Sequence, residues 1–130
     1  LVDLRIEAGN GYRDLLANSE LLKSQHVPSG AVNSCFTFAA RFDGLDQGIS
    51  WDEFRLAFIA NGGDGIYAAW QLIGDEPALA DDDIGWGETP VAKKLQRRIM
   101  QFTSNQRDGV EREVQYDALL KTLRQFGDKL

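Results

Sequence analysis

Carboxylate side chains offer the clearest chemical potential in this sequence, and they gather near its middle. They are Asp75, Glu76, Asp81, Asp82, Asp83 and Glu88. Such groups can bind a hard cation or transfer protons, but three consecutive aspartates point in different directions on most backbones. A carboxylate-based enzyme would use Asp75, Asp83 or Glu88, and one of these acids would have to lie in a cleft that keeps it protonated. Nothing in the sequence supports such burial, so we expect no metal, no other cofactor and no catalytic residue.

A thiol and an imidazole are the other candidates for chemistry. The chain has one cysteine, Cys35, and one histidine, His26. Cys35 follows an apolar pattern beside Phe36, which indicates a buried structural thiol. His26 precedes a proline turn, and no sequence context links it to Cys35, so a Cys-His hydrolase is not favoured. One thiol also excludes an intrachain disulfide and favours a reducing compartment, so we expect a cytoplasmic, non-enzymatic protein.

The charge of the chain is unevenly distributed. The 130 residues carry a net charge of −6, yet residues 56–92 hold seven acidic residues and no Lys or Arg. Residues 93–130 hold nine basic and five acidic residues, and four of the cations, Lys93, Lys94, Arg97 and Arg98, lie within two helical turns. These cations make nucleic-acid binding the alternative function, although the acidic chain as a whole opposes it.

Trp86 is the most unusual residue of the acidic segment, because it lies between Gly85 and Gly87. One interpretation is a side chain that folds back onto the core. The other is an exposed anchor for a partner, since aromatic anchors commonly dominate interface energetics. The leading hypothesis is therefore a protein-binding loop that contains Trp86, Asp81, Asp82, Asp83 and Glu88.

Hydrophobic periodicity predicts an all-α fold, a compact bundle of four to six helices in a single domain, with an irregular acidic loop around residues 74–88. The first helix is expected after a break at Gly9-Asn10-Gly11. Residues 32–39 fit another helical face, although Phe36-Thr37-Phe38 also fits a short strand. Ser50 and Glu53 form a capping box for a helix that ends near Gly62.

The second half of the chain is also predicted to be helical. A short helix is expected from Ile66, Ala69, Trp70 and Ile73. Thr89-Pro90 is a strong helix start, and the buried face of that helix is predicted to contain Val91, Leu95, Ile99 and Phe102. A last helix, containing residues 114–126, is expected to end at Gly127.

Two segments, Ile49–Leu56 and Val114–Lys121, share an order of β-branched, polar, aromatic, acidic and then hydrophobic residues. This order resembles the exit from an EF-hand loop into its second helix. Calcium ligands are missing, because Leu45 and Gln47 replace oxygen-rich ligands in the first segment, and Ala118 takes the last ligand position in the second. The resemblance implies an ion-free helix-loop-helix scaffold for protein contacts.

These features favour a non-enzymatic protein-protein interaction domain, such as an adaptor, inhibitor or accessory protein. Its acidic loop would bind a basic or amphipathic surface of another protein, since complementary charge speeds association. No stretch has the ~18 to 20 apolar residues that span a bilayer, so we expect no membrane partner. Because the chain begins with Leu1, we expect a processed form or a domain of a longer protein.

Overall fold

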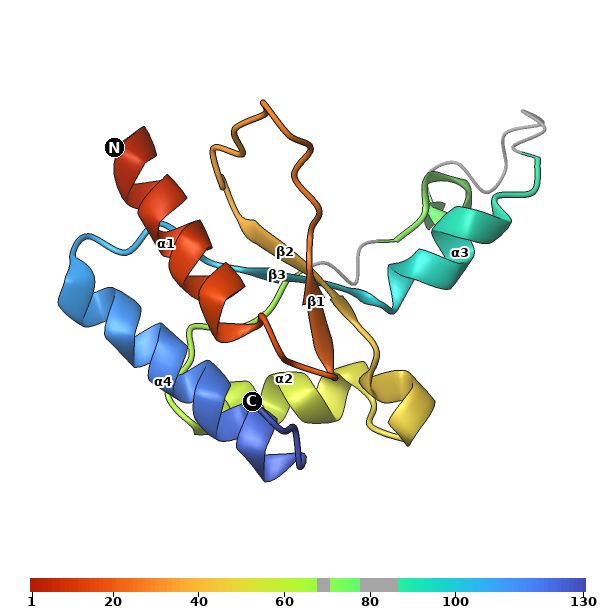
Figure 1. The fold of residues 1–130 in the computed structure, drawn as a ribbon. Helices are drawn as coiled ribbons and strands as arrows, with labels where there is room; N and C mark the ends of the chain where they lie inside the picture. The colour runs from red at the N-terminus through yellow and green to blue at the C-terminus, as the bar shows by residue number, and fades with distance from the viewer. Residues whose placement is uncertain (68–70, 78–86) are drawn as a thin grey trace.

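The computed structural model describes residues 1–67, 71–77 and 87–130, and within them it shows a mixed α/β fold (Figure 1). The α-helices are α1 (Val2–Leu15), α2 (Trp51–Ala60), α3 (Pro90–Gln96) and α4 (Gly109–Gln125). The strands are β1 (Leu22–Ser24), β2 (Phe38–Phe42) and β3 (Ile99–Phe102). Two 3-10 turns, η1 (Gly44–Gln47) and η2 (Ile73–Asp75), complete the described elements. The prediction of an all-α helical bundle is therefore wrong.

The three strands form an antiparallel sheet in the order β1-β2-β3. Phe38, Ala40 and Phe42 of β2 are buried on one face, whereas Ala39 and Arg41 alternate onto the other. The buried face packs against side chains from α1, α2 and α4, and α4 lies against both of the other helices (Figure 1). Since side chains alternate along a strand, the outer face of this sheet carries the partly exposed residues.

The wrong fold class results mainly from residues 99–102, which were predicted to be helical but form β3. Val91, Leu95, Ile99 and Phe102 continue a helical spacing, yet α3 ends at Gln96 and the chain then enters the sheet. The N–H of Phe42 donates to the carbonyl of Arg98 at 2.6 Å, and Phe38 stands opposite Phe102 in the register. Pairing with a distant strand therefore overrides the local pattern, as is common for short strands. Val91 and Leu95 are exposed rather than buried.

The predicted break at Gly9-Asn10-Gly11 is also wrong, because α1 runs through it. These glycines allow side chains from other parts of the chain to pack closely against α1. A Cβ at Gly9 would collide with the Sγ of Cys35, and one at Gly11 would collide with the Tyr116 hydroxyl. The approach of these side chains requires glycine inside the helix, despite the lower helix propensity of glycine.

The predicted helix ends are confirmed at several places. Ser50 and Glu53 form the capping box at the start of α2. Gly62 follows this helix with φ +100°, and Gly127 follows α4 with φ +80°, which is the left-handed conformation expected of a C-terminal cap. Helix α3 begins at Pro90, although the Thr89 hydroxyl makes no capping hydrogen bond.

Two further predictions are wrong. The short helix expected from Ile66 is not formed at Tyr67, whose backbone exchanges hydrogen bonds with Gln101 of β3. Ala69 and Trp70 lie outside the described residues, and Ile73 begins only the short turn η2. The EF-hand resemblance also fails in its second segment, because residues 114–121 lie inside the continuous helix α4 rather than at the exit of a loop.

The capping box provides a pH-dependent prediction. The hydroxyl and backbone N–H of Ser50 both donate to the Glu53 carboxylate, and these bonds lower the pKa of Glu53. A pKa that is lower in the folded state stabilises the protein above the unfolded value, about 4.3, and this contribution is lost as the pH falls through the folded pKa. In urea unfolding, the wild type should be more stable than Glu53→Gln at pH 7. The gap should narrow near pH 3, and an equal gap at both values would contradict the role of the charge.

Candidate docking site on the arm

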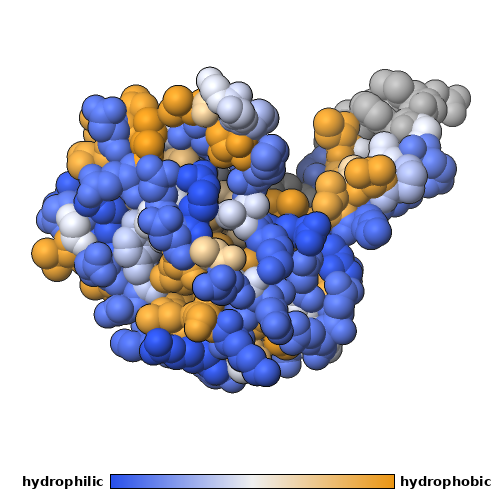
Figure 2. All heavy atoms as spheres, viewed as in Figure 1, coloured by the Kyte–Doolittle hydropathy of each residue, from blue (hydrophilic) through white to orange (hydrophobic). Residues whose placement is uncertain are grey.

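An extension of the chain projects from the body beyond the end of the sheet (Figures 1 and 2). We call residues 71–77 and 87–98 the arm. It contains η2 and α3, and a cleft between the two is lined by residues from both, including Leu72, Ile73 and Ala92. The arm joins the sheet at its base, where Arg98 leads directly into β3.

The arm has no core of its own among the described residues. Neither η2 nor α3 contains a buried residue, and α3 has only seven residues. The side chains of Ile73, Val91 and Leu95 are 64%, 70% and 37% exposed, and Figure 2 shows hydrophobic surface along this extension. Isolated helices of this length are marginal in water, and clustered exposed apolar side chains are typical of interaction surfaces.

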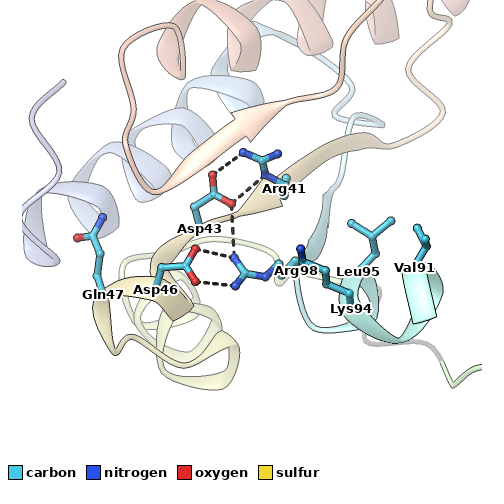
Figure 3. A pocket seen from close by; sticks show the side chains of 8 residues that line it. All are labelled: Arg41, Asp43, Asp46, Gln47, Val91, Lys94, Leu95 and Arg98. Atoms are coloured by element: carbon cyan, nitrogen blue, oxygen red, sulfur yellow. Dashed lines mark hydrogen bonds and ion pairs between the residues drawn. The ribbon is translucent and has the colours of Figure 1, made fainter. Parts of the chain in front are cut away.

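Ion pairs attach the base of α3 to the body (Figure 3). The Arg98 guanidinium donates two hydrogen bonds to Asp46 of η1, at 2.8 and 2.6 Å, and one of its nitrogens lies 3.7 Å from Asp43. Asp43 in turn accepts two hydrogen bonds from Arg41 of β2, at 2.8 and 2.7 Å. The planar two-pronged contacts are the geometry that arginine makes best with carboxylates, and they link the base of the arm to η1.

The same charges surround an open groove of about 690 Å³ between η1 and α3. Its lining residues come from β2, η1, α3 and the adjoining turns, and are Arg41, Asp43, Asp46, Gln47, Val91, Lys94, Leu95 and Arg98. The hydrogen bonds from Arg98 lower the pKa of Asp46, and the nearby charges of Lys94 and Arg41 act in the same direction. The pKa of Arg41 is raised, mainly by its hydrogen bonds to Asp43.

The structure separates the four predicted cations. Lys93 lies 3.2 Å from Glu88, and Arg98 pairs with the carboxylates of the groove. Lys94 lines the groove, whereas Arg97 lies beside Leu45 and Trp51 at a separate hollow. Lys94 and Arg98 therefore share the groove, whereas Lys93 and Arg97 line other hollows.

The acidic candidates are only partly within the described structure. Trp86, Asp81, Asp82 and Asp83 lie outside the described residues. The side chain of Glu88 is 85% exposed, and Asp75 is exposed as well. Asp75 lines the cleft between η2 and α3. Among residues 1–67, 71–77 and 87–130, no cluster of Cys, His, Asp and Glu could hold a metal ion.

The burial predicted for Cys35 is confirmed, since only 1% of the residue is exposed. Burial raises the pKa of its thiol, which disfavours the reactive thiolate. His26 lies on the exposed loop between β1 and β2. Within the described chain, no helix is long and apolar enough to cross a membrane.

Sequence reasoning missed the groove, because Arg41, Asp43 and Asp46 were not among its candidates. Asp43 and Asp46 lie close together in the sequence, but Arg98 is 52 residues away from Asp46. Their meeting depends on the β2–β3 register, which places Arg41 opposite Ile99. The groove could therefore be predicted from the sequence only after this strand pair had been predicted.

No family model and no curated protein matches the sequence significantly. Its fold, an antiparallel three-stranded sheet with helices on one face, does have a counterpart among solved structures. The structure is similar to a DegT DnrJ EryC1 StrS aminotransferase from Brucella abortus, with a TM-score of 0.69 and 16% sequence identity. The match covers 96% of this chain and 31% of that chain. At this identity the similarity shows a shared fold, and the chain spans about a third of the aminotransferase chain.

Proposed function

We propose that this chain is a non-catalytic docking domain that binds another protein through its arm. The observation that supports this most directly is an arm without buried residues that exposes Ile73, Val91 and Leu95. A seven-residue helix gains little stability alone, and burial of these side chains by a partner would contribute about 25 cal/mol per Å² of apolar area. The ion pairs at Arg98 hold the arm out for that contact.

The acidic segment belongs to the same proposal. Pro77 and Gly87 lie on the arm, so residues 78–86, which include Trp86 and Asp81 to Asp83, are inserted in this part of the chain. Their charge would attract a basic or amphipathic region of the partner, and Trp86 would supply an aromatic contact. The lone Cys35 thiol suits a reducing compartment, so we place this interaction in the cytoplasm.

A second candidate function comes from the shared fold. The similar protein is described as an aminotransferase, and it is about three times as long as the matched segment. In this alternative, the chain is one module of an aminotransferase-like enzyme, and the surface that covers the arm belongs to the remaining part of that enzyme. Both candidates require docking on the arm, but they differ in the identity of the partner.

Photo-crosslinking in cells tests the docking role. A photoreactive amino acid would replace Val91 on the arm, or Val32 on the loop between β1 and β2 as the control. The two valines are matched in chemistry and in exposure, 70% and 79%. We expect a discrete crosslinked species from position 91 and none from position 32, because only the arm faces a partner.

Mass spectrometry of the crosslinked species separates the two candidates. A partner with an aminotransferase sequence, including a longer form of this chain, would support the enzyme module. A partner without one would support the adaptor role. Equal crosslinking from positions 91 and 32 would overturn docking through the arm.

A further inference from the structure

The groove between η1 and α3 has a charge and shape that fit one kind of partner segment. We propose that it binds an acidic peptide segment in which a carboxylate lies next to apolar side chains. This inference rests on the proposed docking role of the arm and adds a second contact to it, because residues 78–86 would attract a basic region of the partner and the groove would bind a separate, acidic one. Three observations support it: the charge of the groove, the apolar residues beside it, and its position at the base of the arm.

The first observation is an excess of positive charge. Arg41, Lys94 and Arg98 line the groove with only two carboxylates, Asp43 and Asp46. Both carboxylates are already engaged by the two arginines. Lys94 contributes to the lowered pKa of Asp46 but makes no ion pair with a described residue, so within this part of the chain its ammonium group can still pair with an incoming carboxylate.

The positive surface continues onto the sheet. Lys23 of β1 stands directly opposite Arg41 of β2 in the register, and both are exposed. The Lys23 ammonium donates to the backbone carbonyl of Ser19, and the Arg41 guanidinium is held by Asp43. The two residues therefore add positive charge beside the groove, but neither is an unpaired group.

The second observation is the apolar wall. Val91 and Leu95 are four residues apart on α3, so they lie on one side of the helix, and both line the groove. Figure 3 shows them next to Lys94, along the same helix. A segment that presents a carboxylate to Lys94 would therefore bring its neighbouring side chains against an apolar surface.

These residues favour a peptide over a nucleic acid. A phosphate backbone carries a regular series of negative charges, whereas Lys94 is the one cation of the groove that makes no ion pair with a described residue. Val91 and Leu95 offer aliphatic contacts rather than the aromatic stacking that single strands prefer. The position of the groove at the base of the arm also makes it continuous with the surface proposed for protein docking.

A phage-displayed library of random peptides provides the probe. It would be selected against the full 130-residue chain, and the enriched peptides would be synthesised and measured by fluorescence anisotropy. Lys94→Glu is the test variant, and Lys121→Glu is its control, since Lys121 is an exposed lysine of α4. We expect enriched peptides that combine Asp or Glu with apolar residues. Their Kd should rise about tenfold or more with Lys94→Glu and stay unchanged with Lys121→Glu.

The other outcomes would overturn the inference. Enriched peptides without acidic residues, or peptides that bind both lysine variants equally, would exclude the groove as the site. Stronger, Lys94-dependent binding of a single-stranded oligonucleotide of about 20 nucleotides would assign the groove to nucleic acid. If position 91 crosslinks in cells while Lys94→Glu leaves peptide binding intact, docking through the arm stands and only the groove inference fails.

Discussion

Replacing Phe102 by alanine is expected to lower the free energy of unfolding by about 3 to 5 kcal/mol. Phe102 of β3 is 1% exposed and lies at the centre of the aromatic core. Its ring centroid is 5.6 Å from that of Tyr12 in α1 and 5.5 Å from that of Phe58 in α2. The substitution therefore opens a cavity where the sheet meets two helices, and the rigid rings around it cannot collapse to fill the space.

Urea unfolding, followed by circular dichroism, measures this effect. Phe102→Leu retains most of the apolar volume and should cost much less, roughly 1 kcal/mol. Val32→Ala changes a side chain that is 79% exposed and should leave stability within about 0.5 kcal/mol. A loss below about 1 kcal/mol for Phe102→Ala would show that β3 does not pack its Phe102 against α1 and α2.

The features that could be predicted from the sequence are those with local causes. The capping box needs only Ser50 and Glu53, three residues apart, and the helix stops at Gly62 and Gly127 need only a residue that tolerates positive φ. Each of these predictions depends on groups within one turn of the backbone. The local geometry was therefore available without knowledge of the tertiary fold.

The fold class could not be predicted because its causes are distant in sequence. Strand β3 has four residues, too few for its alternation to outweigh a helical spacing that happens to include Val91 and Leu95. Its strand conformation depends on β2, about 60 residues earlier. The helix through Gly9 and Gly11 was unpredictable for the same reason. These glycines accommodate Cys35 and Tyr116, which are distant in sequence, so their neighbours in the chain do not explain them.

The candidate site combines features that have local causes with features that depend on distant parts of the chain. The helix start at Pro90 and the cations of 93–98 were visible as local patterns, but the pairing of Arg98 with Asp46 needs the completed sheet. Tertiary contacts also reverse the expected burial of α3. Val91 was predicted to be buried because it follows the helical period, yet the arm carries it away from the core. An apolar residue in a regular helical pattern can thus be exposed rather than part of a core.

Replacing Asp128 by alanine is expected to lower the free energy of unfolding by about 2 to 4 kcal/mol, although only two residues follow it in the sequence. Its carboxylate accepts hydrogen bonds from the Ser19 hydroxyl at 2.5 Å and from the backbone N–H of Glu20 at 2.8 Å. A weaker bond of 3.5 Å comes from the N–H of Leu21. Ser19 is fully buried and Asp128 nearly so.

The large effect follows from what the substitution leaves behind. Alanine would leave the buried Ser19 hydroxyl and the partly buried Glu20 N–H without their acceptor, and unpaired buried donors are more costly than lost surface contacts. The turn also starts β1, because the Ser19 hydroxyl oxygen accepts the N–H of Leu22. Asp128→Asn keeps a carbonyl acceptor but turns one oxygen into a donor, so its loss should be intermediate. Lys129→Ala, one residue later and exposed, should unfold at the wild-type urea concentration. Equal midpoints for Asp128→Ala and Lys129→Ala would mean that the carboxylate does not hold the α1–β1 turn.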